Sequence, residues 1–252
     1  MKTQNFAHVP SKVGVVGASG TGKSTYFLRF LRASSYHHKF VFDAQGELWQ
    51  RLGGGVVPCF TTRQLDEAIQ RGGFVVFDPV ELFEGDLPGA WDYFCDLVFR
   101  FAKLTPMTPK LIATDEFQDI SSTDMVEWNL MRVVESGRRY TLDWSSVQQG
   151  LNLVHNRVRT QLTEVIAFRT TDARPLEPLL EMGFPESVSS LPDFSFVAYH
   201  KRSNTFREGK IAHPALKSIN RPDDIDSENE IRNTDQGAGE MGPMDDQARV
   251  EQ

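Results

Sequence analysis

Short apolar runs, each closed by a polar residue or a glycine, recur along most of the chain. Runs of about four to eight residues rich in Val, Ile and Phe are typical of strands covered on both faces of a sheet. The predicted strands are residues 13–16, 39–43, 74–78, 110–115, 141–146, 164–169 and 194–200. Strands that are apolar on both faces favour a parallel sheet.

Between these runs, apolar residues recur at the spacing of three and four that is typical of a helix with one buried face. The predicted helices are residues 24–33, 65–70, 91–104 and 124–136. Asp124 is placed to cap the last helix and Gly137 to end it. The alternation of strands and helices predicts an α/β fold, with a doubly wound, mostly parallel sheet and helices on both faces.

The composition fits one large domain followed by a tail. The chain has 252 residues, of which 40% are hydrophobic, and this is enough for one α/β core. We expect the domain to span residues 1–218. Residues 219–252 contain few apolar side chains and many Asp, Glu, Asn and Gly. We therefore expect them to form an acidic, disordered tail.

The negative charge of the chain is concentrated in that tail. Residues 221–252 hold ten Asp or Glu and three Arg, which matches the formal net charge of −7 of the whole chain. The remainder is therefore neutral, and a local basic patch could still bind DNA. Residues 201–210 form a turn-rich basic stretch, whose composition favours a solvated hairpin over a phosphate contact.

The sequence offers little support for export, disulfides or structural metal. The first ten residues lack the regions of a signal peptide, and no apolar run approaches the roughly 20 residues that span a bilayer. We expect no transmembrane segment and a cytoplasmic location. Cys59 and Cys95 lie in unrelated contexts, and His37 and His38 have no further ligands at useful spacing. The only metal expected is Mg²⁺ carried by a nucleotide.

A complete phosphate-binding motif, G-x-x-x-x-G-K-[ST], lies between the first predicted strand and the first predicted helix. Its glycines let backbone N–H groups curl around phosphates, and the helix N-terminus adds positive potential. Lys23 reaches the outer phosphates and Ser24 ligates Mg²⁺. The predicted nucleotide-binding residues are Gly17, Ala18, Ser19, Gly20, Thr21, Gly22, Lys23, Ser24 and Thr25. The sequence therefore predicts binding of ATP with Mg²⁺.

Two acidic residues supply the second half of this predicted site. Asp115 and Glu116 stand at the carboxyl end of an apolar strand, the edge at which such sheets present side chains to a ligand. Asp115 is placed to hold Mg²⁺ through water, together with Ser24. Glu116 is the candidate general base for the attacking water. The pair predicts hydrolysis of the nucleotide rather than binding alone.

Three further residues are weaker candidates. Gln148, at the end of another predicted strand, is placed to contact the γ-phosphate or its water, although a glutamine there could equally face solvent. Arg138 and Arg139 are possible arginine fingers that reach the nucleotide of a neighbouring subunit, which requires a ring. Their alternative is surface charge at a helix C-terminus, where arginine is favourable in any case.

With these residues in place, the chain resembles the FtsK–HerA superfamily of P-loop ATPases. Within it, the chain resembles the genome-packaging ATPases of membrane-containing, double-jelly-roll bacterial and archaeal viruses. The resemblance covers about residues 11–200. The segments that carry it are residues 17–25, 43–47, 111–117, 137–140, 146–148, 165–170 and 172–174. The ordered set is far more specific than any one of its members.

The resemblance implies a RecA-like core with an extra strand between the phosphate-loop strand and the acid strand. It also implies a homo-oligomeric ring, of six or a similar number of subunits, that moves double-stranded DNA through its pore without reading sequence. Glu116 would be the base, Gln148 the sensor, and Arg138 or Arg139 the finger in trans. The chain departs from the FtsK pattern at Gln149, where a basic residue or proline is usual, and it carries no winged-helix domain.

These features favour a viral genome-packaging ATPase, with capsid vertex or portal proteins as partners and the virion and host cytoplasm as its locations. A phage-assembly ATPase, a plasmid-transfer motor and a nucleotide-gated protein of the capsid vertex remain alternatives. A small-molecule kinase is disfavoured because no arginine-rich lid segment is present. Residues 52–55 and 81–89 are candidate DNA-contacting loops or ordinary surface loops.

Overall fold

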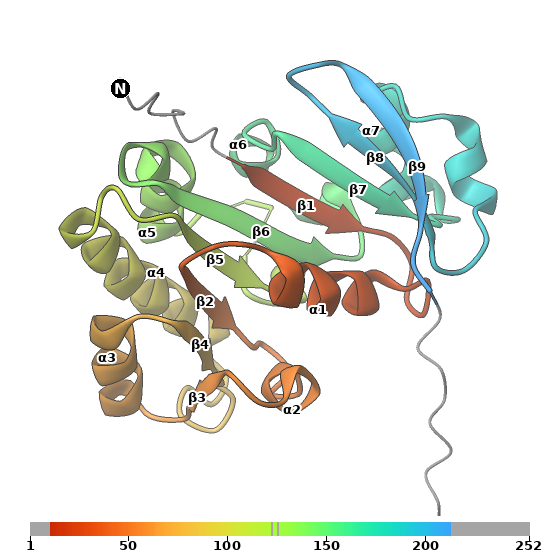
Figure 1. The fold of residues 1–252 in the computed structure, drawn as a ribbon. Coiled ribbons are helices and arrows are strands. Elements are labelled where there is room, and N and C mark those ends of the chain that lie inside the picture. Colours follow the sequence, from red (N-terminus) through yellow and green to blue (C-terminus); the bar gives the residue numbers. More distant parts are fainter. Residues whose placement is uncertain (1–10, 122, 125, 213–252) are drawn as a thin grey trace, which may run out of the picture. The chain divides into compact units, whose positions relative to one another are not determined.

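The computed structural model describes residues 11–121, 123–124 and 126–212. These residues form one continuous sheet and the helices that pack on it (Figure 1). The tail expected from residue 219 onward lies outside the described residues. The strands are β1 (Lys12–Val16), β2 (His38–Phe42), β3 (Val57–Cys59), β4 (Phe74–Phe77), β5 (Lys110–Thr114), β6 (Leu142–Gln148), β7 (Glu164–Phe168), β8 (Ser195–His200) and β9 (Thr205–Lys210). Across the described sheet their order is β3-β4-β2-β5-β6-β1-β7-β8-β9.

The sheet is parallel from β3 to β7, and β8 and β9 extend it as an antiparallel hairpin. Strand β6 lies between the phosphate-loop strand β1 and the acid strand β5, as the resemblance implies. Parallel strands end at a common edge, so the residues after β1, β5 and β6 meet there. The predicted α/β fold with a mostly parallel sheet is confirmed. Within the basic stretch 201–210, residues 205–210 form β9.

Helices cover both faces of the sheet (Figure 1). They are α1 (Lys23–Ala33), α2 (Leu48–Leu52), α3 (Thr62–Arg71), α4 (Leu87–Leu104), α5 (Trp128–Met131), α6 (Asn156–Arg159) and α7 (Ala173–Glu181). Helices α1 and α2 pack on one face with Val15, whereas α3, α4, α5 and α7 pack on the other with Val16. Alternate residues of a strand point to opposite faces, so one buried strand contributes to two cores.

Aromatic residues dominate the core under α4. Phe42 lies edge-on to Trp91, with ring centroids 5.2 Å apart, and 5.6 Å from Phe94. All three side chains are fully buried. Burial of one such side chain stabilises the fold by about 1.5–3 kcal/mol, so this cluster fixes α4 against the sheet. Among the described helices, none is long and apolar enough to cross a membrane.

The helix predicted at residues 124–136 was wrong at both ends. Helix α5 starts at Trp128 after its N-cap Glu127, and continues as a π-helical turn, η2 (Arg132–Ser136), and a 3₁₀ turn, η3 (Gly137–Tyr140). Gly137 has φ −53° and does not end the helix. A Cβ there would lie 2.7 Å from the carbonyl oxygen of Leu142, so glycine allows a close approach of two backbones. Thr141, with φ 50°, ends the segment.

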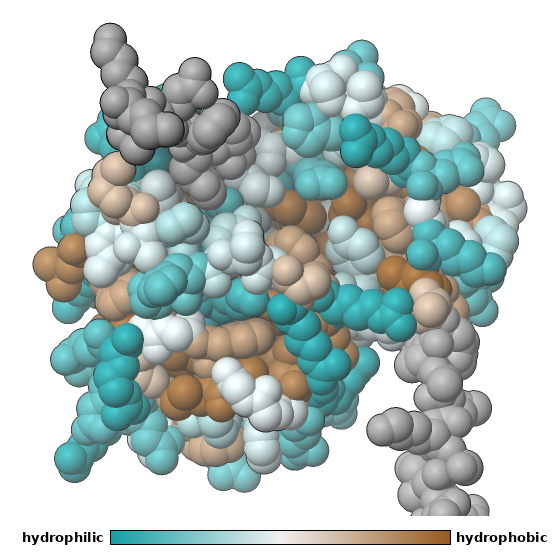
Figure 2. Space-filling view, in the orientation of Figure 1, coloured by the Kyte–Doolittle hydropathy of each residue, from teal (hydrophilic) through white to brown (hydrophobic). Residues whose placement is uncertain are grey.

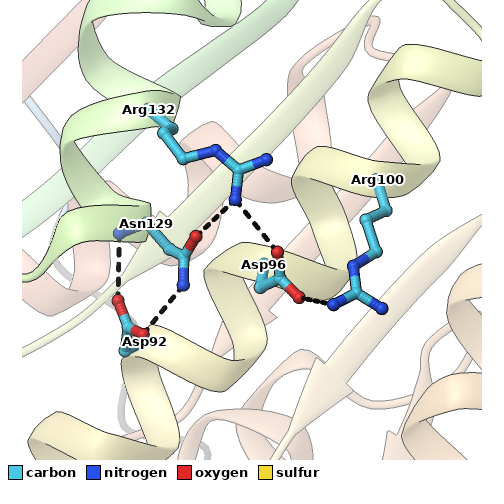
Figure 3. A network of polar contacts seen from close by, with 5 residues as sticks. All are labelled: Asp92, Asp96, Arg100, Asn129 and Arg132. Carbon is cyan, nitrogen blue, oxygen red and sulfur yellow. Dashed lines mark hydrogen bonds and ion pairs between the residues drawn. The ribbon is translucent and has the colours of Figure 1, made fainter.

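A polar network holds this segment against α4 (Figure 3). The Asp92 carboxylate accepts hydrogen bonds from the backbone N–H of Asn129 at 3.0 Å and from its side-chain amide at 2.8 Å. The Arg132 guanidinium donates to Asp96 at 3.0 Å and to the Asn129 side-chain oxygen at 2.6 Å. Arg100 forms a second ion pair with Asp96. The position of α5 and η2 is thus set by directed bonds as well as by packing.

Candidate nucleotide-binding site

The chain makes a tight turn between β1 and α1, and its glycines are required there. Gly17 has φ 143°, and a Cβ on it would lie 2.7 Å from the Cβ of Phe168. Gly22 has φ 113°, and a Cβ on it would lie 2.9 Å from a ring carbon of Phe194. L-residues with a side chain rarely adopt these conformations. Only glycine therefore lets the loop pack this closely against Phe168 and Phe194.

Two backbone hydrogen bonds clamp this loop to later parts of the chain. The N–H of Ala18 donates to the carbonyl of Arg169 at 2.8 Å, directly after β7. The N–H of Phe194 donates to the carbonyl of Thr21 at 2.8 Å, just before β8. Segments about 150 and 170 residues downstream thus set the shape of the phosphate loop.

Lys23 is folded back into the loop. Its side chain is 6% exposed, and its ammonium donates to the carbonyl of Ala18 at 2.9 Å. The Thr21 hydroxyl donates to the same carbonyl at 2.8 Å. Burial lowers the pKa of Lys23, and the nearby Glu116 opposes that shift. A phosphate is a stronger acceptor than a carbonyl, so the ammonium is poised to exchange one for the other.

Helix α1 offers an anion site at its N-terminus. Its N-cap is Gly22, which gives no side-chain cap, and no acidic residue lies in its first turn. The first N–H groups of the helix are therefore available to a ligand. A cavity of about 220 Å³ opens there, lined by Ser19, Gly20, Gly22, Lys23, Ser24, Thr25, Arg51, Glu116 and Phe194.

Asp115 follows β5 in the neighbourhood of this loop. Its carboxylate accepts a hydrogen bond from the N–H of Ala44 at 3.2 Å. Burial, reinforced by the negative charge of Asp43, raises the pKa of Asp115 to about 8. A divalent cation would reverse this effect, because it favours the ionised carboxylate. The carboxylate, the Ser24 hydroxyl and the accessible N–H groups fit a nucleotide with Mg²⁺.

Glu116 lines the same cavity as Lys23 and has a strained backbone. Its φ and ψ are 41° and 50°, in the left-handed region, which costs a non-glycine residue roughly 1 kcal/mol or more. The Gln118 amide donates to its carboxylate. This conformation turns the chain directly after Asp115, where the 3₁₀ turn η1 (Phe117–Asp119) begins. Such strain concentrates at functional sites.

The structure separates Gln148 from its neighbour Gln149. The Gln148 side chain is fully buried, and its amide nitrogen lies 3.2 Å from where a Cβ on Gly14 would stand. Neither of its amide atoms has a hydrogen-bond partner. Gln149 is exposed and lines a cavity beside Ala18. The sequence reasoning missed Gln149, because only the side-chain alternation along β6 tells which of two adjacent glutamines faces inward.

This second cavity has a volume of about 410 Å³ and adjoins the phosphate loop. It is lined by Ala18, Ser19, Gln149, Asn152, Leu153, Thr170, Thr171, Asp172, Ala173, Arg174 and Pro175. The side-chain oxygen of Asn152 is buried without a hydrogen-bond partner. Asp172 is the N-cap of α7 but makes no side-chain cap bond. The cavity lining therefore includes one carboxylate, that of Asp172, that is not used to cap its helix.

Arg138 and Arg139 lie at the opposite edge of the sheet from the phosphate loop. Both are exposed and belong to η3, which precedes β6. Burial lowers the pKa of Lys12, the first residue of β1. The positive charge of Arg138 is a smaller cause that lowers this pKa in the same direction. The seven residues of β6 span roughly 20 Å. Neither arginine can therefore reach the loop of its own chain.

The fold and this loop define the class of the protein: it has the fold of the P-loop NTPases with an inserted strand between β1 and β5. The genome-packaging NTPase B204 of Sulfolobus turreted icosahedral virus 2, solved with AMPPCP, is similar at a TM-score of 0.65 and 17% identity, over 81% of this chain and 99% of that one. The B204 complex with ATPγS gives a TM-score of 0.63 at 18% identity, over 80% and 97% of the two chains.

The fold is also similar to those of two bacterial proteins. The bacterial conjugative coupling protein TrwB is similar at a TM-score of 0.60 and 10% identity, over 82% of this chain and 85% of that one. VirB4 of Thermoanaerobacter pseudethanolicus is similar at a TM-score of 0.56 and 11% identity, over 82% and 91%. No family model and no curated protein matches the sequence.

Proposed function

We propose that this chain is an ATPase that drives double-stranded DNA into a preformed viral capsid. The observation that carries the proposal is the meeting of a clamped phosphate loop, a buried lysine and two carboxylates at one edge of a RecA-like sheet. The likeness to a viral genome-packaging NTPase, which covers 99% of that protein's chain, supports the proposed role in packaging. The coarser proposal, ATP hydrolysis, rests on the site alone.

In this proposal each residue has a distinct duty. The residues of the phosphate loop, from Gly17 to Thr25, surround the phosphates, and Lys23 neutralises the outer ones. Ser24 and Asp115 hold Mg²⁺, which supplies charge neutralisation of the phosphates when bound. Glu116 takes the proton of the attacking water, as its place in the cavity allows. Loss of Glu116 should therefore leave binding and remove turnover.

The remaining catalytic roles require a ring. Arg138 and Arg139, remote from their own loop, act on the nucleotide of a neighbouring subunit, and the cavity beside Ala18 is the open approach to it. We keep Gln148 as a candidate sensor and add Gln149, whose side chain reaches that cavity without rearrangement. A ring of six subunits would place one such approach at every interface.

The partners follow from the task. The ring would grip the phosphate backbone of double-stranded DNA without reading bases, so binding should be sequence-blind and weaken with salt. Capsid vertex or portal proteins would hold the ring during packaging, in the host cytoplasm and on the virion.

The test is the steady-state ATPase rate with and without double-stranded DNA at two salt concentrations. We expect DNA to raise the rate several-fold at low salt and less at high salt. Glu116→Gln should reduce the rate at least 100-fold. The matched control is Glu67→Gln, on the exposed face of α3, which should leave the rate unchanged. A rate indifferent to DNA would contradict translocation and favour a nucleotide-gated vertex protein.

A DNA-export motor, of the phage-assembly or plasmid-transfer kind, is the second candidate. The likeness to the bacterial conjugative coupling protein TrwB favours it. Both candidates predict ATPase stimulation by DNA, so the separating experiment is co-purification with virions. Recovery of the chain from purified particles, at a vertex, supports packaging; its absence from particles together with DNA-stimulated turnover supports export.

A further inference from the structure

Arg51 is a cation of the phosphate cavity that the phosphate-binding motif does not include. It lines the cavity with Lys23, Ser24 and Glu116, although it comes from α2 rather than from the loop. Its residue is exposed, and within the described residues no acidic side chain forms an ion pair with it. Arg51 thus borders the cavity at the N-terminus of α1, together with Lys23.

The N-terminal side of α2 is bonded to Asp43, which follows β2. The buried carboxylate of Asp43 accepts hydrogen bonds from the N–H groups of Glu47 and Trp49, both at 3.1 Å. The next N–H, that of Ala44, donates to Asp115. The turn that starts α2 is therefore joined to the residue assigned to Mg²⁺.

The C-terminal side of α2 is bonded to the helix of the phosphate loop. The Arg32 guanidinium, on α1, donates to the carbonyl of Arg51 at 2.6 Å and to that of Leu52 at 2.9 Å. The side chains of Leu48 and Leu52 are buried against the same core as Phe27. Arg51 is thus held by its backbone, at a fixed place relative to both halves of the site, while its own side chain stays available.

We propose that Arg51 binds the phosphate chain of the nucleotide in cis, as a cation additional to Lys23. This inference rests on the proposed function, because it concerns the same site. A guanidinium presents several donors in a planar fork that matches phosphate oxygens, which a lysine ammonium does not. With Lys23 and Arg51 against Glu116, the cavity lining carries a positive excess suited to a nucleoside polyphosphate.

An alternative role for Arg51 would be structural, but the bonds that fix α2 do not use its side chain. They come from Asp43, from Arg32 and from the buried leucines. Removal of the guanidinium should therefore leave the fold intact and change affinity. Charge-assisted hydrogen bonds of this kind correspond to about a tenfold to 100-fold change in a binding constant.

The experiment is titration of AMPPCP with Mg²⁺ into the full chain and into Arg51→Ala, Arg51→Gln and Arg51→Lys. We expect the Kd to rise at least tenfold for the Ala and Gln variants and less for Lys, which keeps the charge. Arg63→Ala is the matched control, since Arg63 is an exposed arginine on α3 paired with Glu67. Thermal unfolding midpoints of all variants without nucleotide should agree within a few degrees.

The outcomes distinguish failure of this inference from failure of the proposed function. A Kd for Arg51→Ala and Arg51→Gln within twofold of the Arg63→Ala value overturns the inference. Lys23→Ala should abolish binding; if it does while the Arg51 variants bind normally, the inference fails and the proposed function stands. If the unaltered chain binds no nucleotide, the proposed function itself fails. If Arg51→Ala unfolds early, the Gln variant decides, because it keeps the aliphatic stem.

Discussion

Asp115 combines a buried position with a neighbouring negative charge, and this has consequences for pH. Its pKa in the folded chain is about 8, above the ordinary value of 3.8. At a pH between these two pKa values, Asp115 is protonated in the folded chain and mostly ionised in the unfolded chain. The contribution of Asp115 to the free energy of unfolding is therefore fully present at low pH, and it is lost as the pH rises from about 4 to 8.

We expect Asp115→Asn to stabilise the protein without nucleotide, and to do so more at pH 8 than at pH 5. The asparagine oxygen can still accept the hydrogen bond of Ala44 but cannot ionise. Urea unfolding of both proteins at several pH values, without Mg²⁺, measures the difference. A difference that is constant with pH would contradict the raised pKa. Nucleotide with Mg²⁺ should stabilise the unaltered chain more than the variant.

Gly17 and Gly20 offer a matched pair in the phosphate loop. Both have positive φ, but a Cβ on Gly17 would meet Phe168 at 2.7 Å, whereas nothing lies within 4 Å of one on Gly20. We expect Gly20→Ala to lose about 1–2 kcal/mol from backbone strain, and Gly17→Ala to lose about 1–3 kcal/mol more from overpacking. Urea unfolding measures both. Equal losses would show that the loop moves away from β7 without cost.

At the residue level, the sequence predicts the chemistry of the site better than its packing. Lys23 and Glu116 could be placed at one cavity because a motif and a strand end each fix a position. The sequence could not show which of Gln148 and Gln149 is buried, because a shift of one residue along the strand exchanges the faces of their side chains. Arg51 could not be predicted, because a short helix after β2 places it at the cavity and none of the motifs includes it.

At the level of elements, the segment from α5 to η3 depends on polar bonds to α4 (Figure 3). Asp96 pairs with Arg132, and both side chains are mostly buried, at 19% and 27% exposure. The pair of Arg63 and Glu67 on α3 is far more exposed, at 89% and 52%. Hydrogen bonds between charged groups contribute more to folding stability where solvent is excluded, whereas exposed ion pairs contribute little to it.

We expect Asp96→Ala to lower the free energy of unfolding by about 1–3 kcal/mol, because it leaves Arg132 without its carboxylate partner. Glu67→Ala should change it by less than about 1 kcal/mol. Urea unfolding gives both values, and a double-mutant cycle with Arg132→Ala isolates the pair. A coupling near zero in that cycle would contradict the assigned role of the network.

The same segment shows why the ends of the helix predicted at residues 124–136 were wrong. Three helical geometries follow one another from Trp128 to Tyr140, and only the first has the α period that a sequence pattern reports. Gly137 reads as a helix end by composition, yet close packing on Leu142 explains its presence. Strands were predicted more closely, because burial on both faces leaves a continuous apolar run.

At the scale of the whole molecule, Arg138 and the phosphate loop lie at opposite edges of the sheet. An arginine finger on η3 could therefore act only between subunits. We expect Arg138→Ala or Arg139→Ala subunits to be inactive alone, but to regain part of their ATPase activity when mixed with Lys23→Ala subunits, since some interfaces then join two intact halves. The ATPase rate of mixtures over a range of ratios measures this. Strictly proportional loss would contradict a finger in trans.

The architecture as a whole was predictable because α/β order is encoded repeatedly, in each strand followed by a helix. The strand inserted between β1 and β5 came from the family resemblance and not from the residues themselves. Neither the short strand β3 nor the strand character of β9 left a pattern: the first has three residues and the second is almost wholly exposed. Local pattern weakens where an element is short or solvated.

The clamp on the phosphate loop limits how far this protein can be shortened. Every residue of the loop, both acids and the candidate arginines lie before residue 150. The hydrogen bonds that shape the loop, however, come from Arg169 and Phe194. A fragment that ends after β6 would thus contain every residue predicted to bind or hydrolyse the nucleotide, but not the segments that give the loop its shape. The part of the chain that holds the predicted site residues is therefore not its smallest working unit.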